Sequence, residues 1–432
     1  MDQSLAAALL MVGAVVVVLA SGLWISIGLA GIGILSFYLF LPPSMMRMVE
    51  VIQYNTLNDF IIAAIPLFIF MGSLLYKGDI ASKIYRGLGK SVSRLPGGLV
   101  QTNIVACAIF GACSGSSLAG AATMGTMAVR ELKSQGYEKT LVYGSLAAGG
   151  TLATMIPPSI LFIVYGAFAG ESVSKLFIAG IVPGIILVLL FMGYILVKAL
   201  MQPEVCPRVE PAPLGEALRA LTALILPFLL IAAVLGSIYT GFATPTESAA
   251  VGSVGALAIL AVDGNLRWSV VREAAVLSVR TTCMIALMMV GTQIISTSLS
   301  VLQIPAQISA YFAALAVEPW VIAVLVGLFY LVLGCLIEGT SMFFLTFPVI
   351  YPLMMSLGFD PIWFGVMMAL FIEASLITPP VGLNLFIIQQ VSDEPSLGPA
   401  IKGSLPFCIV IIAVMGLFIA FPEIVLYLPS RL

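Results

Sequence analysis

The chain has 432 residues, of which 61% are hydrophobic and only 9% are charged. A soluble domain carries roughly 25% charged residues, so this composition is typical of an integral membrane protein and excludes the soluble enzyme classes. The formal net charge of −2 gives no basis for binding nucleic acid, and the absence of histidine from the sequence excludes His-based metal sites and Ser–His catalysis.

Apolar segments that are long enough to span a bilayer recur along the chain. They lie near 5–20, 23–41, 60–76, 140–170, 176–200, 220–238, 247–262, 281–300, 362–390 and 404–428. The first has neither the basic residues nor the cleavage site of a signal peptide, so we expect a retained helix. The basic, amphipathic segment 79–95 is predicted to lie at the membrane interface, with 303–315 as its counterpart.

Two more apolar regions, 97–130 and 319–356, are interrupted at their centres by small polar residues. The interruptions read Ser114-Gly115-Ser116-Ser117 and Glu338-Gly339-Thr340-Ser341. A break in a helix at membrane depth is tolerated only where protein or a water-filled cavity covers it. Both regions are therefore predicted to be re-entrant hairpins, although small residues also serve close helix packing.

Basic residues predict the orientation of the chain in the membrane. With the N-terminus outside, all but three of the 18 Lys and Arg residues fall on the cytoplasmic side. The exceptions are Arg47, Lys175 and Arg431. Both termini are then periplasmic, and the chain is expected in a bacterial inner membrane.

Two halves of the chain, 1–200 and 220–432, are predicted to be repeats joined by a polar cytoplasmic linker over 201–219. Gly115 and Gly339 are 224 residues apart, and the two Pro-Pro pairs are 222 residues apart. Each half contains five spans and one hairpin, and because five is odd the second half must enter from the opposite side. We therefore predict an all-α membrane protein of two inverted repeats, as in secondary transporters whose site lies at the midplane.

Each half also has one helix that a proline pair should unwind, at Pro157-Pro158 and at Pro379-Pro380. Freed carbonyls and Ser/Thr hydroxyls suit a small hard cation, and the N-terminus of the half-helix beyond each break suits a carboxylate. The alternative is a pair of kinks that serve packing only. Recurrence at matched spacing beside the hairpins favours a functional site.

Acidic residues in spans are rare and usually functional. Glu338 and Glu373 are predicted to support the site, and Glu247 either supports it or caps a helix. A serine hydrolase would need a base beside its serine, and the sequence offers neither a histidine nor a lysine inside a span. We therefore expect no enzymatic activity. No Arg or Lys lies in the interior of a predicted span, which favours cation coupling for an anionic substrate.

Five motifs resemble the large membrane subunit of tripartite ATP-independent periplasmic transporters. They are Ala64-Ile65-Pro66-Leu67-Phe68, Gly111-Ala112-Cys113-Ser114-Gly115-Ser116-Ser117, Met155-Ile156-Pro157-Pro158-Ser159, Ala243-Thr244-Pro245-Thr246-Glu247-Ser248 and Ile377-Thr378-Pro379-Pro380-Val381-Gly382-Leu383-Asn384. The resemblance covers nearly the whole chain, and the order and spacing of the motifs make it specific.

The resemblance implies a sodium-driven importer of a small organic acid, such as a C4-dicarboxylate or sialic acid, that works as an elevator. It implies two partners, a small four-helix membrane subunit on a separate chain and a periplasmic substrate-binding protein. No cofactor is expected, because sodium serves only as the coupling ion. The alternatives are an ion antiporter or anion exporter of related architecture without a binding protein, or a channel or scaffold.

The same resemblance places two sodium sites and a substrate site. The first sodium site would use Ser114, Gly115, Ser116, Ser117 and Pro157, and the second Gly339, Thr340, Ser341, Thr378, Pro379 and Pro380. The residues expected to bind substrate are Ser116, Pro158, Ser159, Thr340, Gly382 and Asn384.

Overall fold

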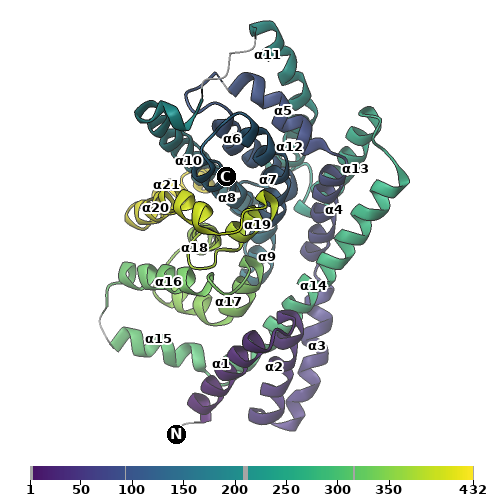
Figure 1. The fold of residues 1–432 in the computed structure, drawn as a ribbon. Helices are drawn as coiled ribbons and strands as arrows, with labels where there is room; N and C mark the ends of the chain where they lie inside the picture. Colours follow the sequence, from purple (N-terminus) through teal and green to yellow (C-terminus); the bar gives the residue numbers. More distant parts are fainter. Residues whose placement is uncertain (1–2, 93, 208–212, 315–316, 432) are drawn as a thin grey trace.

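The computed structural model describes residues 3–92, 94–207, 213–314 and 317–431. Over these ranges the chain consists of helices joined by turns, without a β-strand (Figure 1). Eight helices in the described part are long and apolar enough to cross a membrane, and shorter apolar helices accompany them. The protein is therefore an all-α, polytopic membrane protein, as the composition predicts.

The helices of the first half follow the predicted segments. In chain order they are α1 (Gln3–Ser21), α2 (Ile25–Phe40), α3 (Met46–Leu57), α4 (Ala64–Lys77), α5 (Ile80–Val92), α6 (Leu99–Ser114), α7 (Ser117–Ser134), α8 (Lys139–Met155), α9 (Ile160–Ala169) and α10 (Val173–Met201), with short 3₁₀ helices η1 (Pro43–Met45) and η2 (Phe60–Ala63).

The second half contains a similar succession of helices. These are α11 (Leu214–Leu221), α12 (Ile225–Tyr239), α13 (Pro245–Val262), α14 (Trp268–Val301), α15 (Ile304–Ala314), α16 (Pro319–Leu333), α17 (Gly339–Ser356), α18 (Pro361–Leu376), α19 (Leu383–Ser392), α20 (Gly398–Ala420) and α21 (Glu423–Leu426), with η3 (Pro203–Val205), η4 (Thr222–Leu224) and η5 (Pro429–Arg431).

The helices form two groups that meet along α4 and α14. On one side, α14 packs on α2 and α4, and α4 packs on α13. On the other side, α8 lies among α6, α7, α18 and α20 (Figure 1). Every residue of α18 from Ile362 to Leu376 is buried, so this helix lies at the centre of the second group.

The same order of elements occurs once in each half: helix, short tip, helix, helix, break, helix. In the first half this is α6 to α9, and in the second half α16 to α19. Helices α7 and α17 begin 222 residues apart, and so do α8 and α18. The repeated order places both tips and both breaks in the second helix group. The inverted relation of the two halves, their boundaries at 200 and 220, and the elevator motion stay predictions.

Two helices differ from the sequence-based expectation. Helix α3 was not predicted, because its mixed polar and apolar residues lack the length of a span. Helix α14 begins at Trp268 rather than near 281, so its 34 residues include Arg272 and Arg280. At 1.5 Å per residue it is roughly 50 Å long, which exceeds the bilayer core of about 30 Å. Its basic first part can therefore lie beyond the apolar core. Residues 208–212 of the predicted linker lie outside the described ranges.

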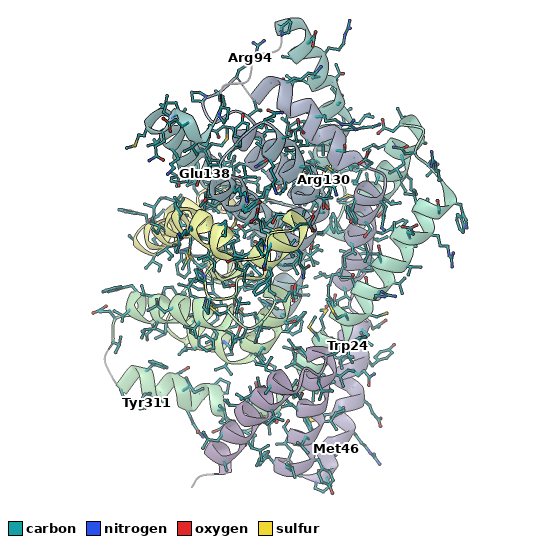
Figure 2. All side chains as sticks on the ribbon, viewed as in Figure 1. Trp24, Met46, Arg94, Arg130, Glu138 and Tyr311 are labelled. Atoms are coloured by element: carbon teal, nitrogen blue, oxygen red, sulfur yellow. The ribbon has the colours of Figure 1, made fainter. Side chains whose placement is uncertain are left out.

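A few labelled side chains mark the two ends of the molecule. Figure 2 shows Arg94, Arg130 and Glu138 in the upper part and Trp24 and Tyr311 in the lower part. Trp24 and Tyr311 are exposed, as expected of aromatic residues at a membrane interface. The orientation of the chain in the membrane, predicted from Lys and Arg, stays a prediction.

Candidate functional site

The first hairpin tip consists of two residues between α6 and α7. Gly115 ends α6 in the left-handed conformation with φ +61°, which glycine adopts without steric cost. Ser116 is extended and caps α7, because its hydroxyl accepts a hydrogen bond from the Ala119 N–H at 3.4 Å. The tip is therefore held by glycine geometry and one neutral cap.

This tip lies directly against the first helix break. A β-carbon on Gly115 would come within 3.3 Å of the Pro158 carbonyl oxygen and the Ile160 nitrogen. The break itself is buried at Pro157, Pro158 and Ser159. The structure thus brings together the tip and the break that were predicted to share the first cation site.

One hydroxyl at the first tip has no hydrogen-bond partner. Ser114 Oγ is buried and makes no hydrogen bond within the described part of the chain. Buried polar atoms are nearly always paired, so an unpaired one needs an explanation such as an absent ion. A serine oxygen beside the carbonyls of an unwound helix is a donor set that suits sodium.

The second hairpin tip is longer and carries a carboxylate. It runs from Gly334 to Glu338 between α16 and α17. Glu338 caps α17: its Oε1 accepts from the Thr340 N–H at 2.9 Å, and its Oε2 accepts from the Ser341 N–H at 3.0 Å and the Ser341 hydroxyl at 3.2 Å. The acidic residue predicted to support the site therefore organises the second tip.

The second break also lies beside its tip. Cys335 Sγ is 3.5 Å from the Pro379 carbonyl oxygen. The Thr378 hydroxyl already donates to the Ala374 carbonyl at 2.6 Å. Pro380 is exposed, and Gly382 takes φ +56° immediately before α19 begins. This break runs over 377–382 and is longer and more open than the first.

Among the polar contacts that join the halves of the chain, two involve predicted site residues of the second half. Asn384 is fully buried, and its Nδ2 donates to Ser117 Oγ at 2.9 Å and to the Ala147 carbonyl at 3.0 Å. Glu373 is also fully buried, and its Oε1 lies 3.0 Å from the Thr154 hydroxyl. The predicted site residues of the second half therefore contact the first hairpin and the first broken helix.

Glu247 is explained as a helix cap. Its carboxylate accepts from the Thr244 N–H and hydroxyl at 2.8 Å each, and the Thr244 hydroxyl accepts from the Glu247 N–H, which completes a capping box. Within the described ranges its side-chain hydrogen bonds go to Thr244, inside this cap. Of the two interpretations from sequence, the structure favours the cap.

Sequence reasoning missed Thr154, which contacts both the break and Glu373. Its carbonyl accepts from the Ser159 hydroxyl at 2.6 Å, across the unwound residues. Threonine is an ordinary residue near a helix end, so only its position three residues before Pro157 could have marked it.

Comparisons with known proteins agree with these motifs. The family described as "Tripartite ATP-independent periplasmic transporter, DctM component" matches residues 12–424. A C4-dicarboxylate large permease of such a transporter from Pseudomonas aeruginosa is 34% identical over 408 residues, covering 94% of each chain. A sialic acid large permease from Vibrio cholerae is 30% identical over 380 residues, covering 87% of each chain.

A solved structure shows a similar fold. The YdaH transporter of Alcanivorax borkumensis superposes with a TM-score of 0.63 over 93% of this chain and 98% of that one, at 17% sequence identity. At this identity the likeness concerns the fold alone.

Proposed function

We propose that this chain, which belongs to the family of DctM components of tripartite ATP-independent periplasmic transporters, imports a small organic acid by sodium symport. As a large permease of this family it is a transporter and not an enzyme. Its family and its apolar helices make it a multi-pass membrane protein. The substrate class, the sodium coupling, the partners and the periplasmic location of both termini are the parts of this proposal that need testing.

The proposed sodium coupling rests on the arrangement of the first hairpin tip and the helix break beside it. The unpaired Ser114 hydroxyl and the contact of Gly115 with Pro158 gather oxygen donors at one point. Ser116, Ser117 and Pro157 would complete this site. The second site would use the backbone around Gly339, Thr340 and Ser341 with Thr378, Pro379 and Pro380, and the Glu338 carboxylate would supply negative charge nearby.

An organic anion must be bound here without basic side chains. No Lys or Arg occurs over 99–129, 140–170 or 319–391, the segments that contain both tips and both breaks. The N-terminal N–H groups of α9 and α19, which begin just after the breaks, are suited to carboxylate oxygens. Ser159 and Gly382 directly precede these two helices, and a sodium ion at each tip would add positive charge.

The substrate class comes from the relatives. One is named for C4-dicarboxylates and another for sialic acid, and both substrates carry carboxylates. We therefore propose a small carboxylate as the substrate. The tripartite family implies a substrate-binding protein and a small permease subunit as partners, with the tips moving against the group around α14 as an elevator.

The test is uptake into proteoliposomes that contain this chain and its small permease subunit. Radiolabelled C4-dicarboxylates and sialic acid are supplied with and without the binding protein, under an inward sodium gradient or in potassium only. Uptake that requires both sodium and the binding protein is expected. Uptake that proceeds without the binding protein would favour an exchanger, and uptake in potassium alone would overturn sodium coupling.

A further inference from the structure

A buried polar contact joins the two broken helices near their ends. Thr154 lies one residue before the end of α8, and Glu373 lies three residues before the end of α18. Glu373 is 0% exposed, and its Oε1 is 3.0 Å from Thr154 Oγ1. Each of these helices ends at one of the two proline breaks. The contact therefore joins the two helices just before their breaks.

The hydroxyl of Thr154 is close to two acceptor positions but has only one hydrogen. Its Oγ1 lies 2.8 Å from the Thr151 carbonyl oxygen and 3.0 Å from Glu373 Oε1. A carbonyl can only accept, and an ionised carboxylate can only accept as well. If both the carbonyl and the carboxylate only accept, the single hydroxyl hydrogen of Thr154 can serve one of them. The other short oxygen–oxygen contact would then have no hydrogen between its two atoms. A proton on Glu373 satisfies both: the carboxyl donates to Thr154 Oγ1, and Thr154 donates to the Thr151 carbonyl.

The surroundings of Glu373 also disfavour a charge. Its Oε2 makes no hydrogen bond within the described ranges, and the chain from 319 to 391 contains no Lys or Arg. In α8 the one basic residue is Lys139, at the opposite end of the helix from Thr154. A buried carboxylate without a cation or a full set of donors is strongly unfavourable, whereas a neutral acid avoids most of that cost.

We propose that Glu373 is a neutral carboxylic acid that donates a hydrogen bond to Thr154 and holds the two broken helices in a fixed relation. It is a positioning residue: it sets where the carbonyls freed at one break lie relative to those at the other. This inference rests on the proposed function, because its consequence is that the two sodium sites are assembled together.

Variants that separate the donor from the charge test this role. Glu373→Gln keeps the size and an N–H donor but can never be ionised, so uptake and its sodium dependence should stay within about twofold of wild type. Glu373→Leu has a similar volume and no donor, and leaves the Thr154 oxygen without its partner. Uptake should fall roughly tenfold or more, because an unsatisfied buried group costs free energy.

The partner residue supplies matched controls. Thr154→Ser keeps the hydroxyl and should retain uptake, whereas Thr154→Val removes it and should behave like Glu373→Leu. The double variant Thr154→Val, Glu373→Leu should be no worse than either single variant, since both remove the same bond. Loss of uptake in Glu373→Gln would show that the carboxylate charge is needed and would overturn the proposal. Normal uptake in Glu373→Leu would overturn it as well.

A measurement without transport keeps this test separate from the proposed function. The infrared spectrum of the purified protein should contain a carboxylic-acid C=O band that is absent from Glu373→Gln. If wild type and variant have the same spectrum in that region, Glu373 is ionised and the proposal fails, whatever the uptake shows. If the band is present but wild-type uptake ignores sodium, the proposed coupling fails while the hydrogen bond stands.

Discussion

The first hairpin tip has two residues between its helices, Gly115 and Ser116, whereas the second has five, from Gly334 to Glu338. Both tips place a capping side chain immediately before the second helix of the hairpin. In the first tip the cap is a hydroxyl with one hydrogen bond, and in the second it is a carboxylate with three. The repeat thus preserves the position of the cap but not its charge.

The two helix breaks beside the tips also differ between the halves, in length and in exposure. The first break is short and buried, and its Ser159 hydroxyl bridges back to Thr154. The second is longer, exposes Pro380, and uses its Thr378 hydroxyl within α18. The unpaired Ser114 hydroxyl belongs to the first tip, and the capping carboxylate to the second. Under the proposed sodium coupling, the two halves would therefore offer a cation different ligands: a neutral hydroxyl in the first half and a carboxylate in the second.

The largest effect is expected at the first tip. In Gly115→Ala the left-handed backbone alone costs about 1–2 kcal/mol, and the new methyl group meets Ile160 and Pro158 at 3.1 to 3.3 Å. The tip and the break must then separate, so uptake should fall to background while the protein still inserts. Uptake and membrane content measured in parallel check this.

Two glycines provide the controls for that variant. Gly170 also has a positive φ, +70°, but a β-carbon there has no atom within 4 Å. Gly170→Ala should carry a similar backbone cost and retain uptake. Gly339 has no positive φ, so Gly339→Ala adds no left-handed backbone cost, but its β-carbon would meet Cγ2 of the buried Ile372 at 2.6 Å, and uptake should fall there as well. Equal losses in Gly115→Ala and Gly170→Ala would mean that backbone strain, not the close approach, is responsible.

The second comparison concerns the caps. Glu338→Ala removes the acceptor of three hydrogen bonds, and Ser116→Ala the acceptor of one. Loss of a helix cap costs typically about 1 kcal/mol, so Glu338→Ala should lower Tm more than Ser116→Ala does. It should also raise the sodium concentration for half-maximal uptake more strongly.

Glu338→Gln separates capping from charge. It keeps a neutral acceptor, so Tm should recover partly while the sodium dependence stays weakened. A variant with the sodium dependence of wild type would show that the charge of Glu338 has no part in cation binding, and the contrast between the tips would then be structural only.

A smaller effect is expected from Ser114→Ala. Its hydroxyl has no partner among the described residues, so its removal should leave Tm nearly unchanged. If the oxygen is a sodium ligand, the sodium concentration for half-maximal uptake should rise severalfold. Unchanged uptake at every sodium concentration would support the alternative in which the small residues of this tip serve packing alone.

The smallest effect is expected at Glu394, just after α19. The Glu394 carboxylate is 2.7 Å from Lys139 Nζ and accepts from the Tyr143 hydroxyl at 3.0 Å. The hydrogen bond from Lys139 holds the pKa of Glu394 below its usual value. A lowered pKa contributes stability above the unfolded-state pKa of about 4.3, and that stability is lost as the pH falls through the lower, folded-state pKa.

Glu394→Gln should therefore lower Tm at pH 7, by about 2 °C or less, because both of its ion-pair partners, Lys139 and Lys133, are exposed to solvent. The difference from wild type should shrink as the pH falls through the acid range. Thermal unfolding of both proteins across that range checks the sign. A difference that is constant with pH would mean that the carboxylate charge does not contribute.

The sequence by itself predicted most of the apolar helices, where both hairpin tips lie and where both helices break. These features are local: glycine permits the left-handed turn of Gly115, and paired prolines remove backbone donors wherever they stand. The exceptions were α3, which is too short and too polar to be predicted as a span, and α14, whose arginines concealed that it begins at Trp268. The backbone of α14 stays helical beyond the apolar residues from which a membrane span is predicted.

Only the tertiary structure decided which distant polar groups meet. Asn384 reaches Ser117, and Glu373 reaches Thr154, across 267 and 219 residues of chain. Periodicity and motifs predict the helix face on which a residue lies. A contact between the two halves depends instead on how the buried helices pack against each other. A buried polar group must find its partner among whatever that packing brings near, so Asn384 and Glu373 acquire their roles only in the folded chain.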